Sequence, residues 1–179
     1  MNVIHILGCS LAIVLFGNWA SSQEKADELL GEWYTQHNES KVLVEKKGGK
    51  YYGTITWLSE PTYEPDDDEA GVIKHDRHNR DKSLRSRPII GITVLRGFVF
   101  NAQKGSWEDG KIYDPENGKD YKGNIHIVSK GKSEEEQSLK VRGYIGFSAL
   151  GRTTVWRRVP EDERSLNRFR RSLPFPLTP

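Results

Sequence analysis

Hydrophobic and polar residues alternate along most of the chain after residue 30. The segment 51–58 is the clearest case, because Tyr51, Gly53, Ile55 and Trp57 fall on one face and the residues between them on the other. A period of two with aromatic and β-branched residues is typical of a strand. Similar segments, separated by turn residues, number about eight: 31–35, 41–46, 51–58, 88–95 with 98–100, 107–113, 119–128, 139–147 and 152–159. They predict an all-β domain, either an antiparallel barrel or a sandwich.

Turn residues join several of these segments directly. Gly48-Gly49 predicts a hairpin, since glycine adopts positive φ without a steric penalty. The run Asp114-Pro115-Glu116-Asn117-Gly118 is a second turn signal, because proline fixes φ and Asn-Gly accepts left-handed geometry. Residues 59–87 differ, with two prolines, the acidic run 66–69 and many charges. A connection of this length is expected to be a functional lid or partly disordered.

The first 22 residues form an apolar stretch that differs from the rest of the chain. It carries no charged side chain and ends in the small residues Ala20-Ser21-Ser22, which predicts a signal peptide cleaved before Gln23. The alternatives are a membrane anchor, for which the run is shorter than the ~20 residues of a span, and lipidation at Cys9. The signal peptide implies export, to the periplasm or beyond. Its cleavage removes Cys9, the single cysteine, so the mature protein is expected to have no disulfides.

Residues 160–179 form a basic, proline-rich tail. Glu161-Asp162-Glu163 is expected to begin a short helix that runs to Arg171, and the prolines after it prevent regular structure. A solvated extension is the simpler interpretation, and contact with an envelope membrane or a protein partner is the alternative. The net charge of +2 is too small to indicate nucleic acid, and no nucleic-acid partner is expected.

Three ordered motifs resemble those of a bacterial exported family, Domain of Unknown Function 2147. They are N-R-D-K-S-L-R-S-R-P-I-I-G (79–91), W-E-D-G-K-I-Y-D-P-E-N-G-K-D-Y (107–121) and V-R-G-Y-I-G-F-S-A-L-G-R-T-T-V-W (141–156). The resemblance covers about 30–159 and implies a single lipocalin-like antiparallel barrel over 23–159, with no established activity. It suggests a set of structural positions: Gly31, Trp33, Asp114, Pro115, Gly118, Gly143, Gly146, Gly151, Trp156 and Arg157.

The start Gly31-Glu32-Trp33 is similar to the lipocalin opening Gly-x-Trp. In that family the tryptophan packs under the barrel against a basic residue of the last strand. Arg157 or Arg158 is expected to stack on Trp33 here, a contact worth about 0.5–2 kcal/mol. The same assignment predicts that Trp33→Ala costs more stability than Trp107→Ala.

No catalytic pattern stands out, and the chain is not expected to be an enzyme. It lacks a nucleophile elbow, a phosphate loop and an H-E-x-x-H motif. Asp114 is the best single carboxylate candidate, but a turn role suits it better. The run His75-Asp76-Arg77-His78 carries ligand types for a divalent metal, although a solvated polar loop is the preferred interpretation. No metal or cofactor is predicted.

The remaining hypothesis is a binding cup. Arginines at 85, 87, 142 and 152 can hold an anionic or carboxylate group through paired hydrogen bonds, or else close one end of the barrel by pairing with Asp114 or Glu32. A small barrel either fills with side chains or holds one small ligand. The predicted ligand contacts are Arg142, Arg152, Tyr113, Tyr144 and Trp57. The preferred function is therefore a small-ligand binding module for an apolar or amphipathic molecule. The alternative is a filled barrel that acts as an envelope structural or interaction protein through the 59–87 loop or the tail.

Overall fold

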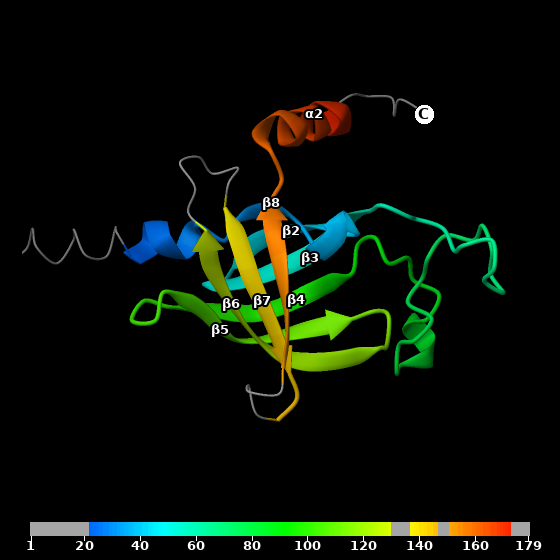
Figure 1. Ribbon diagram of the computed structural model, residues 1–179, viewed down its shortest axis with the longest axis horizontal. Coiled ribbons are helices and arrows are strands. Elements are labelled where there is room, and N and C mark those ends of the chain that lie inside the picture. The colour runs from blue at the N-terminus through cyan, green and yellow to red at the C-terminus, as the bar shows by residue number, and fades with distance from the viewer. Residues whose placement is uncertain (1–21, 130–136, 147–150, 173–179) are drawn as a thin grey trace, which may run out of the picture.

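The protein is an eight-stranded closed antiparallel barrel (Figure 1). The computed structural model describes residues 22–129, 137–146 and 151–172 of the 179-residue chain. Each strand pairs with the next, and β1 pairs with β8 to close the ring. The strands are β1 (Gly31–Tyr34), β2 (Ser40–Lys47), β3 (Lys50–Leu58), β4 (Thr93–Asn101), β5 (Ser106–Asp114), β6 (Lys119–Ser129), β7 (Ser138–Tyr144) and β8 (Arg152–Arg158). The predicted all-β barrel and its strand number are confirmed.

The short helices lie outside the barrel wall. They are a turn and a half over residues 22–27, the 3₁₀ helices η1 (Gln36–Asn38) and η2 (Lys82–Leu84), and α2 (Glu161–Ser172). None of the helices in the described part of the chain is long and apolar enough to cross a membrane. The predicted signal peptide falls almost entirely on residues outside the described ranges, as does the end of the tail.

The strand predicted to begin at residue 88 begins at Thr93 instead. Residues 88–92 still belong to the preceding connection, because Pro88 forms a bridge with His75 and the Ile89 amide donates to the Lys74 carbonyl at 3.0 Å. β4 then continues through Gly97 to Asn101, so the two predicted segments are one strand. The hydrophobic pattern alone does not distinguish an isolated β-bridge, such as the one at Pro88, from a strand of the barrel.

A bulge in β3 changes the face of Trp57. The pairing with β2 shifts between Lys41 and Val42, so that Val42 faces Ile55 and Lys41 faces Trp57. An extra residue reverses the alternation of side chains beyond it. Ile55 therefore points inward, whereas Trp57 lies outside, 39% exposed, with its ring edge against Tyr34. The predicted common face of residues 51 to 57 holds only as far as Ile55.

One end of the barrel, called here the closed end, is filled by aromatic side chains. Trp33 and Trp107 are buried, and their indole nitrogens donate to the carbonyls of Leu29 (2.9 Å) and Ala26 (3.1 Å). Phe98 fills the interior next to Gly110, where an added Cβ would lie 2.3 Å from its ring. The N-terminal helix covers this end (Figure 1). Two tryptophans thus attach the lead-in segment to the barrel.

Arg158, and not Arg157, stacks on Trp33. Its guanidinium lies 4.0 Å from the indole centroid and donates to the carbonyls of Leu30 (2.8 Å) and Glu28 (2.5 Å). Gly31 has φ +109°, and a Cβ there would lie 3.0 Å from the guanidinium. Glycine therefore allows both the backbone conformation and the approach of the arginine. Arg157 points the other way and lies over Tyr34 on the outer wall.

The tail helix contacts the outer wall through its first turn. The Glu163 carboxylate accepts hydrogen bonds from Tyr34 (2.6 Å) and from Lys41, which is 5% exposed. Burial raises the pKa of Glu163, but the hydrogen bonds from Lys41 and Tyr34 outweigh it and lower the pKa overall. Residues 161–163 are therefore part of the folded body.

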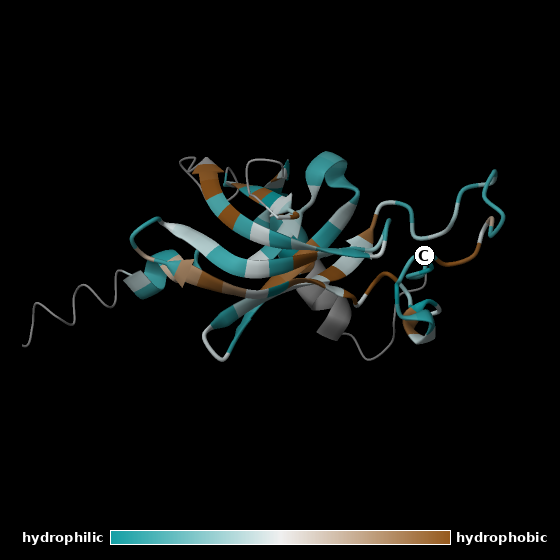
Figure 2. Ribbon diagram, turned by 90° about the horizontal axis from the view of Figure 1, so that it is seen from below, coloured by the Kyte–Doolittle hydropathy of each residue, from teal (hydrophilic) through white to brown (hydrophobic). Residues whose placement is uncertain are grey.

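The 59–92 connection lies at the other end of the barrel, called here the open end, and extends beyond the strands (Figure 1). Thr62 bridges Ile73, and His75 bridges Pro88, so the segment is held by its own backbone pairing. It is largely hydrophilic in composition (Figure 2). The described connection is folded and lines part of a cavity at this end, and the expectation that it acts as a lid stays a prediction.

Candidate functional site

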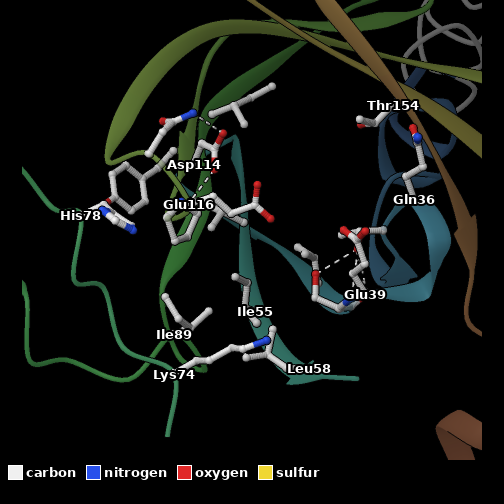
Figure 3. A pocket seen from close by; sticks show the side chains of 18 of the residues that line it. Gln36, Glu39, Ile55, Leu58, Lys74, His78, Ile89, Asp114, Glu116 and Thr154 are labelled. Carbon is white, nitrogen blue, oxygen red and sulfur yellow. Dashed lines mark hydrogen bonds between the residues drawn. The ribbon is translucent and has the colours of Figure 1, made fainter. Parts of the chain in front are cut away.

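A cavity of about 950 Å³ occupies the open end of the barrel. Its walls are the inward side chains of the strands, the η1 turn, the β5–β6 turn and part of the 59–92 connection. Figure 3 shows the labelled side chains around a common open space. The volume lies at the upper end of the range usual for small-molecule sites.

The deep wall of the cavity is apolar. Strand residues that point inward place branched aliphatic side chains and one indole along the wall, and both Val94 and Leu95 do so where the β3–β4 register shifts. They are Val42, Ile55, Val94, Leu95, Ile112, Val141 and Trp156. Most of them also belong to the buried core that continues down to the closed end. An apolar molecule against this wall would be shielded from water on that side.

The upper part of the cavity carries charged groups. Six acidic residues line it: Glu39, Glu60, Glu64, Asp67, Asp114 and Glu116. Three basic residues do so: Lys74, Arg77 and Arg152. Asp114 and Arg152 are candidate site residues from the sequence, and Asp67 and Arg77 belong to the charged runs noted there. The other charged residues lie in connections between strands, where no period in the sequence indicates which way a side chain points.

The five predicted ligand contacts separate into two groups. Tyr113, Tyr144 and Arg152 line the cavity. Trp57 lies on the outer wall because of the bulge. Arg142 stands between Val141 and Gly143, which both line the cavity, so its side chain points outward and donates to Thr153 Oγ1 at 2.7 Å. The structure therefore brings together three of the five.

Asp76 attaches the connection to the barrel. It is fully buried and accepts hydrogen bonds from Tyr113 (2.5 Å), Asn79 (2.7 Å) and both Nε and Nη2 of Arg87 (2.9 and 2.7 Å). Burial, followed by the hydrogen bond to Asp76, raises the pKa of Tyr113 to about 12. The preferred sequence interpretation of residues 75–78 as a solvated loop is wrong for Asp76, because Tyr113 and Arg87 enclose it. Arg87 pairs with Asp76, not with Asp114 or Glu32.

A second set of contacts shapes the wall of the connection. Arg77 stacks 4.1 Å from the Tyr63 centroid and donates to Asp67 at 2.8 and 2.7 Å. The hydrogen bonds from Arg77 lower the pKa of Asp67 to about 2. His75 lies 3.2 Å from Glu69 and 3.3 Å from the Tyr63 hydroxyl. These side chains hold each other and fix the wall of the cavity on this side.

Asp114 acts as a turn residue. Its carboxylate accepts from the Glu116 amide (3.0 Å) and the Asn117 side chain (2.8 Å), and its carbonyl accepts from the Gly118 amide at 2.8 Å. Gly118 has φ +66°, and a Cβ there would lie 1.8 Å from the His78 carbonyl oxygen. Only glycine therefore lets the β5–β6 turn contact the 59–92 connection.

The other predicted structural positions lie near the same end. Pro115 and Gly143 line the cavity, as does Trp156. Gly146 follows β7 in the left-handed region, with φ +73°. A Cβ on Gly151 would lie 2.6 Å from the Gly143 carbonyl oxygen, so this glycine permits the close approach of β7 and β8. Within the described ranges, no three His, Cys, Asp or Glu residues converge to hold a metal ion.

Residues 31–158 match the family model described as "Uncharacterized protein conserved in bacteria (DUF2147)". The chain belongs to this family. The match begins at Gly31 and ends at Arg158, which lie close together at the closed end. Helix α2 lies beyond it. No curated protein matches the chain.

A solved structure shares the architecture of this DUF2147 protein. It is described as "Protein HP1028 from the human pathogen Helicobacter pylori belongs to the lipocalin family". The two are 24% identical, with a TM-score of 0.61 over 78% of this chain and 88% of that one. At this level of identity the similarity establishes a common lipocalin-like fold.

Proposed function

We propose that this protein is an exported binding module that holds a small apolar or amphipathic molecule in the open end of the barrel. The observation that carries the proposal is the cavity of about 950 Å³, with an apolar deep wall and a charged upper part. Ligand sites are typically concave and mostly apolar, with a few polar groups that orient the ligand. The proposal assigns binding, not catalysis, to this cavity.

The architecture of the two ends supports this proposal. The closed end is packed with aromatic side chains, so it supports the barrel without ligand. The open end is bordered by a folded connection whose buried Asp76 network keeps the wall in place. A preformed wall reduces the ordering cost of binding. The alternative of a filled barrel acting through loop or tail requires a packed interior, which this cavity disfavours.

Native mass spectrometry of the protein, expressed with its leader and purified gently, tests the proposal. We expect a discrete adduct that disappears on organic extraction and whose mass identifies the ligand. Recovery of the protein in the soluble envelope fraction tests export. A bare polypeptide that takes up nothing from added lipid extract contradicts the binding function.

A matched pair of variants localises the ligand. Thr154 lines the cavity, whereas its neighbour Thr153 is exposed and faces outward. Thr154→Trp is expected to fill part of the cavity and abolish the adduct. Thr153→Trp introduces the same side chain on the outside of the barrel, and this variant is expected to keep the ligand adduct. Equal adduct in both variants would place the ligand elsewhere.

A further inference from the structure

The charges at the open end decide which kind of end group the cavity accepts. Acidic residues that line the cavity outnumber basic ones six to three. A long-chain ligand with its apolar part against Val94, Ile112 and Trp156 would place its polar end among these charges. The sign of the local charge therefore selects the head group.

Two of the three basic residues are already paired. Arg77 binds Asp67 at 2.7 Å and Glu69 at 3.3 Å. Lys74 lies 3.6 Å from Glu60. Arg152 is the third, and it is exposed at the start of β8. The two pairs also neutralise Asp67 and Glu60, so four acids that line the cavity remain against Arg152 and the balance stays negative.

Several carboxylates remain directed to the cavity. Glu39 and Glu116 approach the open space from two sides, one from the η1–β2 connection and one from the β5–β6 turn (Figure 3). Glu64 lies beside Glu60, and the hydrogen bond between the two carboxyl groups raises the pKa of Glu64. Two carboxylates side by side concentrate negative charge on this side of the cavity.

We propose that the cavity binds molecules with an apolar body and a cationic end, such as a protonated long-chain amine. The cation lies at the upper part of the cavity near Glu39, Glu64 and Glu116, and the chain extends along the apolar wall. This inference rests on the proposed binding function and replaces the expectation that an arginine meets the polar end. The open upper part leaves the ammonium group partly hydrated, which limits its desolvation cost.

A series of ligands with equal chain length separates the head group from the chain. Decylamine, decanoate and decanol, each below its aggregation concentration at pH 7, would be titrated into the protein by calorimetry. We expect decylamine to bind at least about tenfold more tightly than decanoate, with decanol between them, and the preference to shrink at high salt. Thr154→Trp should weaken all three, which excludes binding to the outer surface.

Substitution of single carboxylates tests the position of the cation. Glu116→Gln and Glu39→Gln are each expected to lower the affinity for decylamine about three- to fivefold, as usual for partly exposed charge pairs. The affinity for decanol should not change. Glu45→Gln is the matched control, because Glu45 is exposed on β2 and does not line the cavity.

The outcomes separate the two proposals. Equal or tighter binding of decanoate or decanol overturns the cationic preference and leaves the binding function standing. Loss of decylamine affinity no greater than in Glu45→Gln overturns the assigned position of the charge. Binding of none of the three ligands overturns the binding function and this inference together.

Discussion

The two ends of the barrel use similar side chains for different purposes. At the closed end, Trp33 and Trp107 are buried on all sides, and each donates its indole hydrogen to the lead-in segment. At the open end, Trp156 and Tyr113 are also buried, but each borders the cavity. The closed end therefore concentrates packing and stability, whereas the open end leaves room for a ligand.

Arginine–aromatic contacts show the same contrast. Arg158 at the closed end is buried and donates to three oxygen atoms within the chain. Arg87 at the open end pairs with Asp76 while its side chain stays 39% exposed. Loss of the Arg158 guanidinium leaves the Leu30 and Glu28 carbonyl oxygens without this donor inside the closed end. Loss of the Asp76 carboxylate leaves the Arg87 guanidinium, which water can reach. Substitutions at the closed end should therefore lower the free energy of unfolding more than substitutions at the open end.

The largest expected effect is that of Trp33→Ala, which we expect to lower the free energy of unfolding by about 3–5 kcal/mol. Trp107→Ala should cost less, because no guanidinium stacks on that indole. Trp156→Ala should cost least, because the cavity already removes part of its packing. Urea denaturation of the three variants measures the order. If Trp156→Ala costs as much as Trp33→Ala, stability is not concentrated at the closed end.

Arg158→Lys is expected to lower the free energy of unfolding by about 2–3 kcal/mol, because a lysine cannot reproduce the forked hydrogen bonds. Arg157→Lys is the matched control on the next residue. Its guanidinium lies on the outer wall, where it bonds Asn38 at 2.9 Å, and we expect a loss below about 1 kcal/mol. Thermal or urea unfolding distinguishes them, and equal losses would contradict the assignment of Arg158 to the floor.

Asp76→Ala is expected to lower the free energy of local unfolding at the open end by about 1–3 kcal/mol, because Tyr113 and Asn79 lose a buried hydrogen-bond acceptor. Hydrogen exchange should rise across residues 59–92 and stay unchanged around Trp33. Asp68→Ala, an exposed acid in the same connection, is the control. A uniform increase in exchange over the whole barrel would show that the two ends unfold as one unit.

The smallest effect is a pH dependence at the open end. The pKa of Tyr113 is raised from 10.0 to about 12, so the folded state favours the neutral phenol. Its stabilising contribution is complete below pH 10 and is lost as the pH rises to 12. The difference in tyrosinate absorbance between the native protein and Tyr113→Phe should titrate near pH 12. A midpoint near pH 10 would contradict the buried hydrogen bond to Asp76.

Much of the barrel could be predicted from local sequence because hairpins are local. Each strand pairs with the next, so periodicity and turn residues give both the strands and their order. Strand alternation also distinguishes Arg157 from Arg158. Trp156 points inward, and side chains two residues apart on a strand share a face, so Arg158 is the inward-facing arginine. The same count places Arg142, next to inward Val141, on the outside.

Other features could not be predicted from such patterns. The bulge that turns Trp57 outward depends on the register of β2 against β3. The burial of Asp76 depends on Tyr113, which lies 37 residues further along the chain. Glu39 and Glu116 come from two connections that have no periodicity, and only closure of the barrel brings them to one cavity.

The sequence by itself determined the strands, their meander order, the glycine positions and the family of this protein. These depend on interactions between residues close in the chain or on motifs of a few residues. The tertiary structure decided which charges meet and which space stays open. Burial and electrostatic potential depend on groups that are distant in sequence. Packing of the 59–92 connection on β5 brings Asp76 to Tyr113, and the closed ring of strands carries the turns that line one cavity.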